Sequence, residues 1–167
     1  MKKLIFLILL AIPAFSQQAT RWFATTGEMT LSAATTATVQ QVATTNSQLV
    51  TLDQAVVYCS VACSITQSAN GAAATSTAGT VTPILPAQLN AWIPITFWTT
   101  SNVGTGTAQG GIFHLPAGST VTFNLSKICG NTADITLGNG GTATNYSITI
   151  GSISGTANIT FYGRVTL

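Results

Sequence analysis

Residues able to do acid–base chemistry are few and far apart in this sequence. Its single histidine, His114, falls at the end of an expected strand, where a lone histidine is more typical of a strand rim than of a catalytic base. The segment 151–155, Gly-Ser-Ile-Ser-Gly, has the outline of a nucleophile elbow, but Ile153 stands where the nucleophile would be. The sequence therefore gives no indication of a serine hydrolase.

Carboxylates and metal ligands are equally sparse. The acids are Glu28, Asp53 and Asp134, each in an uncharged neighbourhood, whereas glycoside hydrolysis needs two facing carboxylates. One histidine and three scattered acids match no metal-ligand spacing. Three glycines, at 104, 106 and 110, approach a dinucleotide fingerprint, but Gln109 takes the third glycine position. We therefore expect no metal, no cofactor and no catalytic activity.

The cysteines Cys59, Cys63 and Cys129 are disulfide candidates. Cys59 and Cys63 fall on one face of a strand predicted over residues 54–66. Four residues of extended chain span about 13 Å, whereas the Cα atoms of a disulfide lie about 5–6 Å apart. Either a turn or bulge bends this segment, or Cys129 pairs with one of the two cysteines and the other stays reduced.

An aromatic segment over residues 91–99 is the most informative candidate for binding. Alternation places Trp92, Thr96 and Trp98 on the face opposite Ile95, and two outward tryptophans with a threonine between them suit a sugar or a neighbouring subunit. The alternative is that both rings are buried under the N-terminal arm or against the second sheet, since tryptophan is buried on average. Pro94 places this strand at a sheet edge or in a bulge.

Many short strands must position these residues. Apolar and polar residues alternate strictly over 120–125, 145–150 and 156–167, and this pattern predicts half-buried strands with Phe123, Ile148, Ile159 and Phe161 in the core. Further strands are expected near residues 28–33, 37–43, 54–66, 73–84, 91–100 and 107–115. Turn signals between them favour a single all-β domain, an antiparallel β-sandwich of jelly-roll or immunoglobulin-like type. A small outer-membrane β-barrel is the alternative architecture.

The N-terminus has the layout of a secretory signal. Lys2 and Lys3 precede an apolar run over residues 4–12, which is too short to span a bilayer, and small residues at 14 and 16 suit cleavage after Ser16. We expect residues 1–16 to be a signal peptide, 17–27 a flexible arm and 28–167 the β-sandwich domain. After cleavage no membrane span remains.

Charge is scarce throughout: 46% of the 167 residues are hydrophobic and 5% are charged. Removal of the signal leaves three bases against three acids, a net charge of zero. So few charges predict no ion-pair network and no nucleic-acid binding, and they leave little repulsion between copies.

These features predict a secreted protein, extracellular, on the cell surface or periplasmic, that is non-catalytic and has a structural or adhesive role. Its partners would be other copies of itself or a surface glycan or protein. The alternative function is a carbohydrate-binding module that uses its surface tryptophans.

Overall fold

The structure is a computed structural model, and it describes residues 20–32, 34–41, 49–71, 95–100, 107–139, 142–143 and 145–166. The expected signal peptide, the strand expected over 73–84, and Trp92 with Pro94 lie outside these residues.

The described chain is made of antiparallel β-strands and one short 3-10 helix. The long strands are β1 (Thr20–Thr25), β3 (Thr35–Gln41), β4 (Leu49–Cys59), β5 (Cys63–Gly71), β6 (Ile95–Thr100), β7 (Thr107–Leu115), β8 (Ser119–Asn124), β12 (Asn145–Gly151) and β13 (Thr156–Thr166). The two-residue strands are β2 (Met29–Thr30), β9 (Ile135–Thr136), β10 (Gly138–Asn139) and β11 (Thr142–Ala143), and the helix is η1 (Lys127–Cys129).

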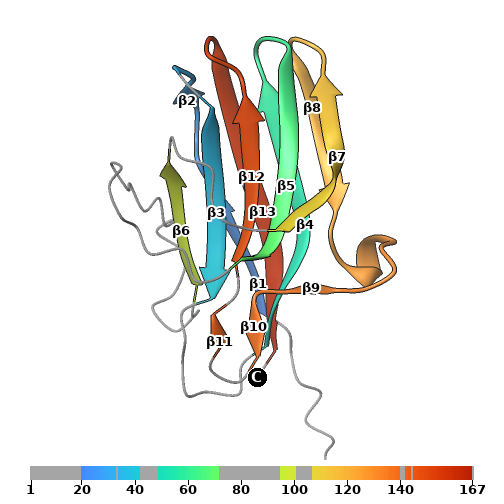
Figure 1. Ribbon diagram of the computed structural model, residues 1–167. Helices are drawn as coiled ribbons and strands as arrows, with labels where there is room; N and C mark the ends of the chain where they lie inside the picture. Colours follow the sequence, from blue (N-terminus) through green and yellow to red (C-terminus); the bar gives the residue numbers. More distant parts are fainter. Residues whose placement is uncertain are drawn as a thin grey trace, which may run out of the picture.

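The strands form two main sheets packed as layers, with sheet B in front of sheet A in Figure 1. Sheet A has the order β1-β13-β4-β8, with β2 beside β13 and β9 beside β4, and sheet B has the order β6-β3-β12-β5-β7. Apart from the step from β5 through β6 to β7, each long strand is followed by one in the opposite sheet. This alternation, together with the strand order in the two sheets, is that of a jelly roll, so the sandwich expected from the sequence is confirmed. The described strands form these two main sheets, both with free edges, and a separate two-stranded sheet of β10 and β11, and the closed barrel of the alternative prediction is not formed.

The core lies where the inner faces of the two sheets meet. The predicted alternation is confirmed in β12 and β13, because Tyr146, Ile148, Ile159 and Phe161 are fully buried. The rings of Tyr146 and Phe161 meet edge to face, with centroids 6.0 Å apart, and so join one sheet to the other. Burial raises the pKa of the Tyr146 hydroxyl, which stays protonated and donates to Gln67 Oε1.

The core prediction is only partly right for Phe123. Its position on the inner face of β8 is as expected, but β8 is an edge strand and Phe123 is only half-buried. Its ring meets Phe113 of β7 edge to face at 5.8 Å. An edge strand has a neighbour on one side only, so its inward side chains stay partly open to solvent.

Several predicted boundaries need correction. Residues 54–66 are not one strand: β4 ends at Cys59, β5 begins at Cys63, and the two strands belong to different sheets. Between them, the Ser60 N–H donates to Thr156 O at 2.8 Å and the Thr156 N–H donates to Ser60 Oγ at 2.7 Å. These bonds hold the turn, which contains neither glycine nor proline and so gives no ordinary sequence signal.

The expected flexible arm over 17–27 is also wrong for its described part. Thr20–Thr25 form β1, which pairs with β13 along its whole length. Trp22 and Ala24 point into the core, and alternate with Arg21 and Phe23, which are exposed. The strand expected over 28–33 is reduced to the two residues of β2.

Candidate functional site

The aromatic segment of the sequence prediction is described only in part. Thr96 and Trp98 belong to β6, where they pair with Gln40 and Thr38 of β3. In the described topology β6 is the last strand of sheet B, so the edge position expected from Pro94 is confirmed. Trp92 lies outside the described residues, and a binding role for Trp92, Thr96 and Trp98 stays a prediction.

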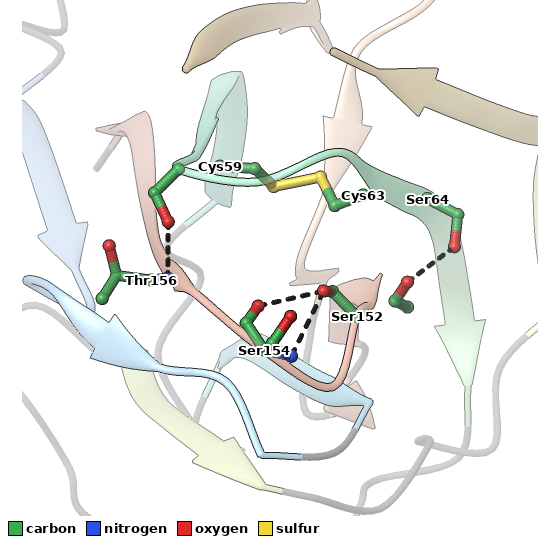
Figure 2. The surroundings of a disulfide bond; sticks show 8 residues. Cys59, Cys63, Ser64, Ser152, Ser154 and Thr156 are labelled. Atoms are coloured by element: carbon green, nitrogen blue, oxygen red, sulfur yellow. Dashed lines mark hydrogen bonds between the residues drawn. A yellow bond between two sulfur atoms is a disulfide. The ribbon is translucent and has the colours of Figure 1, made fainter. Parts of the chain in front are cut away.

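The cysteine alternatives are resolved by the turn between β4 and β5. Cys59 and Cys63 form a disulfide with a Cα–Cα distance of 6.5 Å, and Cys129 is free. Figure 2 shows the bond closing the turn, with Ser152 and Ser154 of the β12–β13 loop close by. The straight strand that would have prevented this pairing does not exist, because the chain turns from one sheet to the other.

This pairing predicts one free thiol in each chain. Labelling of the denatured, non-reduced protein with a thiol reagent should modify Cys129 and neither Cys59 nor Cys63. Replacing both bonded cysteines with serine should lower the free energy of unfolding by about 2 kcal/mol, since the bond closes only a short loop. The control Cys129→Ser should change it by less than about 0.5 kcal/mol. Labelling at Cys59 or Cys63 would contradict the structure.

His114 lies beside a serine, but without the partners of a catalytic base. It pairs across β7 and β5 with Ser64, and both line a shallow open hollow of about 480 Å³. The Ser64 hydroxyl donates to Gly151 O at 3.2 Å, not to His114. Within the described parts of the chain, His114 has no hydrogen bond or ion pair, and no three His, Cys, Asp or Glu residues gather as metal ligands. This hollow offers no oriented nucleophile.

Two of the three acids expected to be isolated, Asp53 and Asp134, are in fact brought together by an arginine. Arg164 Nε donates to both carboxylate oxygens of Asp53, at 2.8 and 3.0 Å, and its Nη2 lies 3.6 Å from Asp134 Oδ1. Asp134 Oδ1 also accepts from the Lys127 N–H at 2.9 Å. Asp53 reaches Arg164 because a β-bulge in β4 leaves it with no residue opposite on β13. The expectation of no ion-pair network is therefore wrong.

The outer face of sheet A carries exposed aromatic rings. Phe23, Tyr58 and Tyr162 are 38%, 38% and 41% exposed. Phe23 lies opposite Tyr162, their ring centroids are 6.3 Å apart and their planes are tilted by 34°. Tyr162 lies opposite Gln54 on β4, and Tyr58 follows Gln54 by four residues on the same face, about 13 Å along the strand.

Polar side chains lie between these rings. Thr25 Oγ1 donates to Asn158 Oδ1 at 3.1 Å and accepts from Thr160 Oγ1 at 2.9 Å, while Thr160 Oγ1 also lies 3.3 Å from Asn158 Oδ1. Register places these three residues on the same face as the rings. We call Phe23, Tyr58, Tyr162, Thr25, Asn158 and Thr160 together the aromatic face.

Sequence reasoning missed the aromatic face because its strands are distant in the chain. Phe23 lies in the segment expected to be a flexible arm, and Tyr162 lies on β13, far from Phe23 in sequence. The available signal was that aromatic rings sit at solvent-side positions of alternating strands, where threonine and asparagine are their neighbours.

Fold and surface together define a jelly-roll β-sandwich with an aromatic outer face on one sheet. No protein-family model, no curated protein and no solved structure matches the chain. Over the described residues, the chain forms no helix with the length and apolarity to cross a membrane.

Proposed function

We propose that the mature chain is an exported, non-catalytic β-sandwich that acts outside the cell or on its surface as a structural or adhesive protein. The observation that carries this proposal is the aromatic face. Exposed aromatic rings that pack against one another, as Phe23 and Tyr162 do, form an apolar surface patch, and such patches mark interaction surfaces. The proposal assigns attachment to this face.

Two further observations support export. The signal-like N-terminus gives a route out of the cytoplasm. The Cys59–Cys63 disulfide is of a kind that persists in oxidising compartments and is rare in the reducing cytosol.

The test measures location and attachment in one experiment. The full chain is expressed with its own leader, and the medium, cell surface and cell interior are separated. We expect the protein outside the cytoplasm, with an N-terminus at or within a few residues of Gln17. Purified, fluorescently labelled protein should bind to whole cells, and the triple variant Phe23→Ser, Tyr58→Ser, Tyr162→Ser should lose most of this binding.

The matched control removes as many exposed apolar side chains from elsewhere. Ile112, Ile128 and Ile153 are 63%, 71% and 79% exposed and lie outside the aromatic face. Their replacement by serine should leave binding intact. Retention of the whole chain inside the cell, or equal loss of binding in both triple variants, would contradict the proposal.

A further inference from the structure

We infer that the aromatic face is a binding site for an extended, neutral polysaccharide. This inference rests on the proposed function, since it names the chemistry of the partner that the adhesive surface would hold. It moves the carbohydrate site expected from the sequence away from the tryptophan segment and onto sheet A.

The rings provide two separated stacking positions. Phe23 and Tyr162 form one, a pair of rings tilted by 34° with centroids 6.3 Å apart. Tyr58 forms the other, about 13 Å along the strand direction. An apolar ring face suits the C–H face of a pyranose, and the Tyr hydroxyls add a polar contact at the ring edge. A polymer of several sugar units spans both positions, whereas a single sugar reaches only one.

The polar groups between the rings are neutral and held in place. Thr25, Asn158 and Thr160 are half-buried and hydrogen-bonded to one another. Asn158 Oδ1 accepts from Thr25, so the amide N–H groups of Asn158 are left as donors, and they have no partner in the described part of the chain. The hydroxyl oxygens of a sugar chain can accept hydrogen bonds from these amide donors. Side chains already fixed in position lose little entropy on binding.

The charge distribution selects a neutral ligand. Arg164 lies two residues after Tyr162 on the same face of β13. Its charge is already paired with Asp53 and Asp134. Arg21, opposite Arg164 on β1, is the exposed cation at that end of the face. Among the described residues of this face, Arg21 alone is a cation without an acidic partner, and one such cation is a poor match for a polyanion, which is recognised by several together. An acidic polysaccharide is therefore disfavoured.

A second copy of the chain fits this face less well. An interface that holds two copies together is apolar at its centre, and charge or polarity is kept to its rim. Here the polar trio lies between the stacking positions, so two facing copies would desolvate hydroxyl and amide groups at the centre of the contact. A sugar polymer alternates C–H faces with hydroxyls, and this matches the alternation of rings and polar groups.

The test is affinity gel electrophoresis of the mature, disulfide-bonded protein. The gels contain a neutral β-glucan, xylan, mannan or dextran, or an acidic polyuronate for comparison. We expect at least one neutral polysaccharide to retard the protein. Tyr162→Ala and Tyr58→Ala should each weaken retardation about tenfold, the loss of one stacking contact. Tyr162→Phe should keep most of it, and the control Ile153→Ala should change nothing. Melting curves of the variants confirm folding.

Other outcomes overturn the inference. The inference fails if no neutral polysaccharide retards the protein, or if the polyuronate retards it more strongly. It also fails if Trp98→Ala abolishes the retardation while Tyr162→Ala leaves it unchanged. Dimers in sedimentation that dissociate on Tyr162→Ala, with no sugar binding, would assign the face to a second copy. If cell binding depends on the aromatic face while no polysaccharide retards the protein, this inference fails and the proposed adhesive function stands.

Discussion

Replacing Phe161 with alanine is expected to lower the free energy of unfolding by about 3–5 kcal/mol. The side chain is fully buried at the centre of β13, and its ring packs edge to face against Tyr146 of the opposite sheet. Truncation removes apolar surface from the core and leaves a cavity that two hydrogen-bonded sheets cannot easily close. The measurement is chemical denaturation of the mature protein, with the midpoint and slope compared between variants.

Phe123→Ala provides the comparison, because it removes the same atoms from a half-buried site. Its ring packs at the open edge between β7 and β8, where solvent already reaches it and can fill the space. We expect a loss less than half that of Phe161→Ala. The sequence pattern alone predicts equal losses at the two positions. A loss below about 1 kcal/mol for Phe161→Ala would mean that β13 presents its other face to the core.

Replacing Gly163 with alanine is expected to lower the free energy of unfolding. Extra methyl groups in a packed core cost about 1–3 kcal/mol, and we expect a value in the upper part of this range. Gly163 lies opposite Trp22, and a Cβ at this position would overlap both the Thr51 carbonyl oxygen and the Trp22 ring. Trp22 is 4% exposed, so its ring cannot move aside without breaking the contact between β1 and the core. The backbone carbonyl of Thr51 is fixed by the β4–β13 pairing.

The matched control is Gly111→Ala in the edge strand β7. No atom lies within 4 Å of a Cβ built at Gly111, and its backbone is outside the left-handed region. We expect a change within about 0.5 kcal/mol there. Tryptophan fluorescence should report the Gly163 effect directly if Trp22 becomes more exposed. Equal, small changes at both glycines would show that β1 does not pack on β13 through Trp22.

The alternation of residue types was sufficient to predict the inward faces of β12 and β13. Apolar residues such as Ile148 and Phe161 occupy every second position there, and this pattern is typical of a half-buried strand. It could not predict the turn after Cys59, which is stabilised by hydrogen bonds to Thr156, nearly a hundred residues later. A period of two continues through such a turn without a break, so one strand was predicted where there are two.

Features that depend on register were beyond sequence reasoning for the same physical reason. The Arg164–Asp53 ion pair requires a bulge that places Asp53 beside a residue 111 positions away. The aromatic face likewise needs β1, β13 and β4 side by side in that order. Tyr162 and Phe23 could each be assigned a solvent-facing position from local pattern, but their proximity follows only from the pairing of the strands.

The order of strands in the sheets also bears on when this chain can fold. In sheet A, β13 lies between β1 and β4, and in sheet B, β12 lies between β3 and β5, although both follow all four of these strands in sequence. The bond from Thr160 to Thr25 spans 135 residues. Such distant contacts make folding slow, because loop-closure entropy is lost before the contacts form. A chain still emerging from the ribosome lacks the middle of both sheets. Neither sheet can therefore be completed until the last two long strands, β12 and β13, have been made.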